Sequence, residues 1–272
     1  MKALAALALV MLGAGAAAAG CGDAAAACTV AGGAYHIALP GAPAGAPAVM
    51  FLHGAGGSGA TVLRHAGMVA AMRARGYAVI APDGMARAGR FGAGWSFHPG
   101  VPGARDEAAF LQAVAADAAG RFGIDRARVL LAGFSVGGSM TSYVACAVPG
   151  AFAAYAPVGG GFWRPHPGHC AGPVRLFHTH GWRDTTVPLE GRILGGGAIA
   201  QGDIFRGLEI WRAANGCTQM RPDGFRQTGP FLHRVWTACA PGSALEFALH
   251  PGAHAVPEGW APMVLDWFEA LD

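Results

Sequence analysis

Short apolar runs alternate with longer amphipathic stretches along most of this 272-residue chain. The runs that predict strands are Ala34–Leu39, Ala48–Leu52, Tyr77–Pro82, Ala127–Ala132, Ala153–Val158, Val174–Thr179, Leu232–Thr237 and Leu245–His250. The stretches that predict helices are Thr61–Arg75, Asp106–Phe122, a helix from Ser135, Gly202–Ala214 and Pro262–Leu271. Several strands are apolar on both faces, which is typical of a sheet that helices cover on both sides. The pattern therefore predicts an α/β fold with a mostly parallel central sheet, and nothing in it marks a linker between domains.

The start of the chain predicts a segment that targets the protein for export. Lys2 provides a positive charge, residues 3–12 are apolar, and Ala17-Ala18-Ala19 is a small-residue cleavage site. The apolar stretch is too short and too rich in alanine and glycine for a stable membrane span, which takes about 20 residues. We therefore expect a cleaved signal peptide at residues 1–19, a single domain at 20–272, and a secreted or periplasmic protein.

The cysteine content also favours export to an oxidising compartment. The six are Cys21, Cys28, Cys146, Cys170, Cys217 and Cys239. No C-x-x-C pair supports a zinc ribbon or a thioredoxin-like site. Among the pairings that six cysteines allow, the sequential one (21–28, 146–170 and 217–239) is the simplest. An alternative makes Ala18-Ala19-Gly20-Cys21 a lipoprotein signal, but alanine stands where leucine is usual, and lipidation of Cys21 would leave Cys28 unpaired.

Composition and charge narrow the class of partner. Hydrophobic residues make up 53% of the chain and charged residues 13%, which excludes a disordered acidic or basic chain. The formal net charge is only +3, and Lys2 contributes one of those charges. No basic stripe results from this balance, so we expect no nucleic-acid partner.

The motif that carries most chemistry is Gly133-Phe134-Ser135-Val136-Gly137. A predicted strand runs into it and a predicted helix leaves it. This context is typical of a nucleophile elbow, in which a strained strand-to-helix turn exposes a serine hydroxyl above the sheet. Small residues at both ends permit the close approach that such a turn needs. The alternative is a glycine-rich helix cap whose serine has no chemical role.

A serine nucleophile needs a base and a group that orients the base. In α/β hydrolases these follow in the order Ser, Asp or Glu, then His. Asp184 comes just after the strand Val174–Thr179, and His254 just after the strand that ends near His250. Both are therefore expected on the sheet edge that carries Ser135. The alternatives are that Asp184 is an exposed loop acid or a partner of Arg183, and that His250 is the base.

A His-Gly turn follows the strand Ala48–Leu52 and predicts an oxyanion-binding loop. The N–H of Val136 is one expected donor, and the N–H of Gly54 or Ala55 the other. His53 is expected to shape the turn rather than act as base, because it belongs to a different loop and precedes Ser135.

Two rival interpretations rest on the same regions. Gly54, Gly56 and Gly59 fit the spacing of a dinucleotide fingerprint, with Asp83 after the next strand. That interpretation leaves the elbow and the cysteines unexplained. His178 and His180 could ligate a metal, but no third ligand is evident. We therefore expect neither a metal nor an organic cofactor.

From about Tyr35 onward, the chain resembles the polyhydroxybutyrate depolymerase and feruloyl esterase family of secreted α/β hydrolases. The matching motifs are His53-Gly54, Trp95, Asp106-Glu107, Phe110, Ile124–Val129 before the elbow, Ala145-Cys146, Phe152–Ala154, Ala156–Val158, His180-Gly181, Asp184, Val187-Pro188, Asn215–Cys217, Cys239, Gly252, His254 and Pro257. The resemblance implies a catalytic domain at 20–272, a Ser135–His254–Asp184 triad, and disulfides 146–170 and 217–239.

The resemblance also suggests substrates. No polymer-binding domain or Ser/Thr-rich linker follows the catalytic part, so 3-hydroxybutyrate oligomers or small esters are favoured over crystalline polymer. Val256 stands where the family commonly has Trp, so one wall of the cleft is expected to differ. Trp95, Phe97 and Trp163 are apolar loop residues and candidate walls of the substrate cleft; the alternative is that they only pack against the rest of the protein. The alternatives are a feruloyl or acetyl-xylan esterase acting on plant cell-wall esters, and an inactive secreted binding protein on a hydrolase scaffold.

Overall fold

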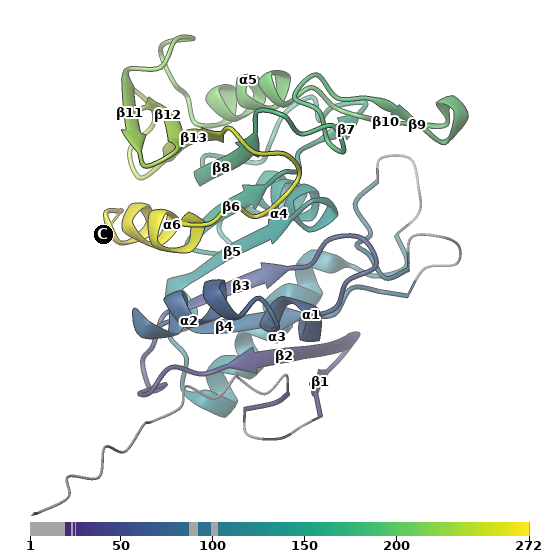
Figure 1. Ribbon diagram of the computed structural model, residues 1–272, viewed down its shortest axis with the longest axis vertical. Coiled ribbons are helices and arrows are strands. Elements are labelled where there is room, and N and C mark those ends of the chain that lie inside the picture. Colours follow the sequence, from purple (N-terminus) through teal and green to yellow (C-terminus); the bar gives the residue numbers. More distant parts are fainter. Residues whose placement is uncertain (1–19, 23, 25, 87–91, 99–102, 272) are drawn as a thin grey trace, which may run out of the picture.

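One sheet of ten strands organises the chain in the computed structural model, which describes residues 20–22, 24, 26–86, 92–98 and 103–271. The expected signal peptide at 1–19 lies outside the described residues. The strands follow the order β1-β2-β4-β3-β5-β6-β8-β13-β12-β11, from bottom to top in Figure 1. The predicted α/β fold with a mostly parallel sheet is thus confirmed.

Six neighbouring strands in the middle of the sheet are parallel. They are β4 (Ala78–Pro82), β3 (Ala48–Leu52), β5 (Val129–Phe134), β6 (Ala154–Val158), β8 (Arg175–Gly181) and β13 (Ala244–His250). Every residue of β3, β4 and β6 is buried, as continuous apolar runs predict for strands covered on both faces. The carboxyl ends of all six lie at one edge, where open α/β sheets place their ligands.

Antiparallel strands close both ends of the sheet. β2 (Gly33–Ala38) pairs with β4, and β1 (Cys28–Val30) pairs with β2. At the other end β12 (Phe231–Trp236) pairs with β13, and β11 (Gly224–Thr228) pairs with β12. A separate small sheet joins β7 (Trp163–Arg164), β10 (Ile199–Gln201) and β9 (Ile193–Leu194).

Helices cover both faces and bury two hydrophobic clusters against the sheet (Figure 1). One face carries α1 (Gly59–Leu63), α2 (Ala66–Ala74) and α6 (Trp260–Glu269). The other face carries α3 (Glu107–Phe122), α4 (Val136–Ala147) and α5 (Ile204–Ala214). Two short 3₁₀ helices, η1 (Arg126–Arg128) and η2 (Gly195–Gly197), lie in the connections. Within the described ranges, no helix combines the length and apolar character needed to cross a bilayer.

Some elements differ from the sequence-based expectation. The helix expected over Thr61–Arg75 is instead two helices, α1 and α2. Arg64 caps the end of the first and His65 the start of the second. The strand expected from Ala127 starts at Val129, because the Asp125 carboxylate accepts a hydrogen bond from the N–H of Ala127 and caps a 3₁₀ turn. The pattern did not predict β1, β7, β9, β10 or β11.

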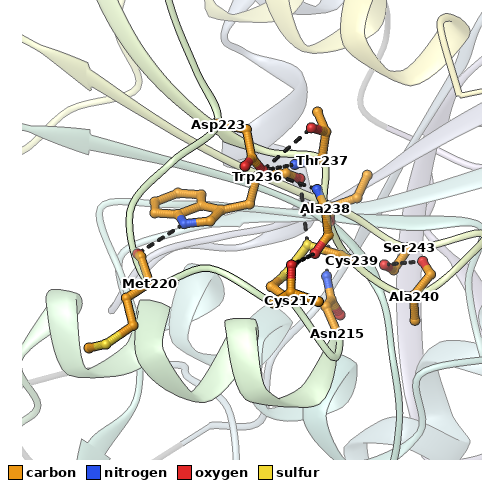
Figure 2. The surroundings of a disulfide bond; sticks show 12 residues. Asn215, Cys217, Met220, Asp223, Trp236, Thr237, Ala238, Cys239, Ala240 and Ser243 are labelled. Atoms are coloured by element: carbon orange, nitrogen blue, oxygen red, sulfur yellow. Dashed lines mark hydrogen bonds between the residues drawn. A yellow bond between two sulfur atoms is a disulfide. The ribbon is translucent and has the colours of Figure 1, made fainter.

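Three disulfides follow the sequential pairing, Cys21–Cys28, Cys146–Cys170 and Cys217–Cys239. The second ties the end of α4 to the loop after β7. Figure 2 shows the third, which joins the segment after α5 to the segment after β12. Nearby, Asp223 accepts hydrogen bonds from the backbone N–H groups of Thr237 and Ala238. All three bridges lie outside the six central strands, which are joined by strand pairing and by hydrophobic packing against the helices.

Candidate active site

Ser135 occupies the tight turn between β5 and α4. Its φ of 59° and ψ of −121° make it the only non-glycine residue with a positive φ in the described part of the chain. Gly133 and Gly137, on either side of this turn, have no room for a side chain. A Cβ on Gly137 would lie 2.3 Å from the carbonyl oxygen of Leu52, and one on Gly133 would lie 2.5 Å from that of Gly137. This strained backbone persists because the strand and the helix hold it from both sides.

A hydrogen-bonded chain of three side chains crosses this edge of the sheet. His254 Nε2 lies 3.0 Å from Ser135 Oγ, and His254 Nδ1 lies 2.7 Å from Asp184 Oδ2. Ser135 follows β5, Asp184 follows β8 and His254 follows β13, so three separate parallel strands deliver them. The Phe134 ring packs 4.6 Å from the His254 ring, measured between centroids.

Asp184 is almost fully buried and is held at both carboxylate oxygens. Oδ1 accepts hydrogen bonds from the N–H groups of Thr186 (2.9 Å) and Val187 (2.8 Å), which leaves Oδ2 for His254. Burial by itself raises the pKa of Asp184, but the hydrogen bonds from His254 and Val187 and the charge of His254 outweigh it. The net effect is a pKa below the ordinary value, so the carboxylate stays ionised.

His250, the alternative base, occupies the last position of β13. It is buried, and its Nδ1 accepts a hydrogen bond from the N–H of Gly252 at 3.1 Å. Burial lowers the pKa of His250. The histidine that reaches Ser135 is therefore His254, four residues further along.

The loop after β3 lies against the serine. A Cβ added to Gly54 would lie 3.4 Å from Ser135 Cβ, so its backbone is next to the nucleophile, while Ala55 is exposed. Val136 is the first residue of α4, and its N–H therefore has no partner one turn earlier in the helix. Val136 and Gly54 thus lie next to Ser135 in the structure, as the expected oxyanion-binding loop requires.

His53 holds this loop in shape. Its Nε2 accepts the N–H of Gly84 at 2.9 Å, so its Nδ1 carries the proton and donates to the Gly54 carbonyl at 2.7 Å. Burial lowers the pKa of His53 and favours this neutral form. The indole N–H of Trp95 donates to the His53 carbonyl at 2.9 Å.

Solved structures superpose on most of this chain. An acetyl xylan esterase from Aspergillus awamori gives a TM-score of 0.66 at 17% identity, covering 88% of this chain and 94% of that one. A Bacillus cereus carboxylesterase gives 0.59 at 13% identity, covering 89% and 96%. A Mesorhizobium loti carboxylesterase gives 0.58 at 16% identity, covering 89% and 97%. The chain has the α/β-hydrolase fold.

One curated relative shares sequence as well. It is a protein provisionally described as the esterase NocK, from Nocardia uniformis subsp. tsuyamanensis. The two are 34% identical over 163 residues, which span 57% of this chain and 45% of that relative. No protein-family model matches the chain.

The three candidate cleft aromatics take different places in this α/β-hydrolase fold. Trp95 has no solvent exposure, so it does not wall an open cleft. Its hydrogen bond to the His53 carbonyl supports the His53 loop instead. Trp163 is 9% exposed and donates from its indole N–H to Ser139 Oγ at 3.3 Å. Phe97 stacks on Tyr143 and lines a cavity of about 540 Å³ on the flank of α4. Of the three, only Phe97 lines this cavity.

The residues behind the two rival interpretations have local partners. Asp83 Oδ1 accepts the N–H of Gly59 at 2.7 Å, and a Cβ on Gly59 would lie 2.0 Å from the Ala81 carbonyl oxygen. These contacts explain both residues without a nucleotide. His178 and His180 are hydrogen-bonded to each other. Among the residues that the structure describes, no group of three or more His, Cys, Asp or Glu side chains is arranged to hold a metal ion.

From the sequence, Val187 was named only as part of a matching motif, and it was not predicted that Val187 and Thr186 hold Asp184. The N–H groups of Thr186 and Val187 stand two and three positions after the acid, the spacing at which Asp commonly folds back on its own backbone. The Asp-x-Thr-Val pattern is therefore a usable signal. Phe134, the variable position before the serine, was also missed, and only its ring contact with His254 reveals it.

Proposed function

We propose that this chain is a serine hydrolase that cleaves carboxylic esters through an acyl-enzyme. The observation that carries the proposal is the hydrogen-bonded chain from Ser135 through His254 to Asp184, at the strained turn after β5. This is the arrangement that turns a serine hydroxyl into a nucleophile. The esterases that share the fold and the partial sequence match to an esterase-named relative support it.

Each residue has a role that its position allows. His254 Nε2 takes the proton of Ser135 as Oγ bonds to the ester carbonyl carbon, and the carbonyl oxygen becomes an oxyanion. The N–H of Val136 and that of Gly54 or Ala55 stabilise this oxyanion, and one such donor typically contributes about 10²–10³ in turnover. Asp184 holds the imidazole in the tautomer with the proton on Nδ1 and stabilises the imidazolium.

The cycle then completes through three further proton transfers. The bond to the alkoxy oxygen breaks, His254 gives its proton to the leaving alcohol, and the acyl group remains on Ser135. Water next gives a proton to His254 while its oxygen attacks the acyl carbon. The bond to Ser135 Oγ breaks, the proton returns to the serine, and the carboxylic acid leaves. No step needs a cofactor.

The proposed substrates are 3-hydroxybutyrate oligomers or small esters, as the family resemblance implies. A second candidate, an acetyl or feruloyl esterase acting on plant cell-wall esters, is favoured by the structural likeness to the Aspergillus awamori acetyl xylan esterase. A panel of p-nitrophenyl esters, methyl ferulate, acetylated xylan and 3-hydroxybutyrate oligomers separates the two. The class with the highest kcat/KM identifies the substrate.

Labelling with a fluorophosphonate tests the nucleophile itself. We expect the wild type to be labelled at Ser135 and the Ser135→Ala variant to lose both labelling and ester hydrolysis. Ser142→Ala is the matched control. Ser142 is a buried serine on α4, the helix that follows Ser135, and its hydroxyl donates to the Gly138 carbonyl. A Ser135→Ala variant with more than about a hundredth of wild-type turnover would overturn the proposal. Wild-type protein that is neither labelled nor active would instead support the inactive binding scaffold.

A further inference from the structure

Two buried histidines beside the proposed triad have no part in the mechanism above. His178 and His180 lie on the same face of β8, because side chains two positions apart in a strand point the same way. Both are almost completely buried. His178 Nε2 lies 3.1 Å from His180 Nδ1, and His180 Nε2 lies 2.8 Å from the carbonyl oxygen of Val187.

The protons in this pair can be placed from their partners. A carbonyl oxygen only accepts, so His180 Nε2 must donate to Val187. Burial lowers the pKa of both imidazoles and keeps them neutral. His180 Nδ1 is then an acceptor, and His178 Nε2 must donate to it. The two rings therefore form a directed chain of hydrogen bonds that ends on Val187.

Val187 is the residue through which this chain reaches the proposed triad. Its carbonyl accepts from His180, and its N–H donates to Asp184 Oδ1 at 2.8 Å. His180 Nε2 also lies 3.6 Å from Asp184 Oδ2, the oxygen that faces His254. The turn 184–187 is thus held to β8 on one side and holds the carboxylate on the other.

We propose that His180, itself oriented by His178, is a positioning residue that fixes Asp184 against His254 through Val187. The inference rests on the proposed function and deepens it. His180 touches neither the substrate nor the reacting serine. Its effect is to keep Oδ2 of Asp184 within hydrogen-bond distance of His254 throughout the catalytic cycle.

Three variants test this role. His180→Leu keeps a buried side chain but removes the donor to Val187, whereas His180→Gln supplies an amide N–H at about the same reach. His233→Leu is the control for loss of a buried histidine, because His233 is equally buried but binds Glu246 on the neighbouring strand. For each, kcat and KM on p-nitrophenyl acetate are measured beside the thermal midpoint of unfolding.

We expect His180→Leu to lower kcat by about 10- to 100-fold with KM nearly unchanged, since a small misplacement of a catalytic group has effects of this size. His180→Gln should recover most of that loss. His233→Leu should lower the unfolding midpoint and leave kcat within about twofold of wild type, since it touches no triad residue. A His180→Leu variant that loses stability but keeps wild-type kcat would overturn the inference.

A double variant tests whether His180 acts through Asp184. Residues that act as a unit give non-additive losses. In an Asp184→Asn background, His180→Leu should therefore lower kcat by less than about twofold. A full additional loss would mean that His180 acts by another route and would overturn the inference. If wild-type protein shows neither turnover nor fluorophosphonate labelling of Ser135, the proposed function itself fails, and this inference fails with it.

Discussion

Asp184 is the residue whose chemistry can be isolated most cleanly. In an Asp184→Asn variant, the remaining oxygen still accepts from the N–H groups of Thr186 and Val187, so the fold is retained. The amide N–H₂ then faces His254 Nδ1 and favours the tautomer with the proton on Nε2. That nitrogen cannot take the serine proton, and kcat should fall by up to about 10⁴. Turnover of p-nitrophenyl acetate and the far-UV circular dichroism spectrum measure the two effects.

The same substitution in a Ser135→Ala background provides the control. Triad residues act as a unit, so the second substitution should add little to the catalytic loss. An equal loss in both backgrounds would show that Asp184 acts independently of the serine.

His250 and His254 should separate stability from chemistry. His254→Ala removes the group 3.0 Å from Ser135 Oγ and should abolish turnover while leaving the unfolding midpoint nearly unchanged. His250→Ala leaves the partly buried Gly252 N–H without its acceptor and should lower stability by about 1 kcal/mol with turnover retained. Steady-state kinetics and urea unfolding of both variants decide the matter. An inactive His250→Ala beside an active His254→Ala would reverse the assignment of the base.

For single residues, the sequence predicted the proposed catalytic side chains better than the residues that position them. Ser135, Asp184 and His254 each follow a run that reads as a buried strand, so topology alone brings them to one edge. His180 and Val187 meet through a backbone carbonyl, and no side-chain pattern records such a contact. Trp95 was expected at the cleft because loops usually carry binding residues, but its indole N–H is bound to the carbonyl of His53 in the interior.

Among the elements, β8 carries a consequence for stability in acid. Burial lowers the pKa of His178 and of His180 in the folded protein, whereas unfolded histidine titrates near 6.5. Below about pH 6.5 the unfolded chain therefore binds protons that the folded chain does not. The free energy of unfolding is therefore unaffected by the titration of these two histidines above that pH. As the pH falls from there toward their folded-state pKa values, it decreases by up to about 1.4 kcal/mol per pH unit for each histidine.

The variant His178→Gln tests this sign. Glutamine retains a donor for His180 Nδ1 but does not titrate. We expect the free energy of urea unfolding to fall less steeply between about pH 7 and about pH 4.5 in the variant than in wild type. Identical slopes would show that other groups cause the acid sensitivity.

The strands that the sequence located most closely are those with buried, continuous apolar runs. β3, β4 and β6 are buried at every position, and the pattern located each to within about a residue, closer than the usual error at element ends. β11 was missed because it is an exposed edge strand whose Phe225 side chain is 72% exposed, so no face alternates. β7, β9 and β10 are short and pair only with one another. Their existence depends on long-range contacts rather than on local sequence.

For the whole molecule, the expected export route predicts a specific mass and thiol count. We expect the mature protein to begin at or near Gly20, to carry no lipid, and to have no free thiol, since the three disulfides use all six cysteines. Intact-mass spectrometry and thiol titration under denaturant check this. A diacylglyceryl increment on Cys21 would instead indicate a lipoprotein, and would leave Cys28 titratable.

The place of β13 in the sheet has a consequence for how the protein is made. β13 lies between β8 and β12, although the chain produces it after both. A chain that emerges from the ribosome or the export channel amino end first presents Ser135 and Asp184 long before β13 and the His254 that follows it. Until β13 pairs with β8, the proposed base His254 is not held beside Ser135. If the chain is exported and acts as proposed, we therefore expect the nascent chain to be inert toward the ester-linked lipids of the membrane, and to become active only when the sheet is completed.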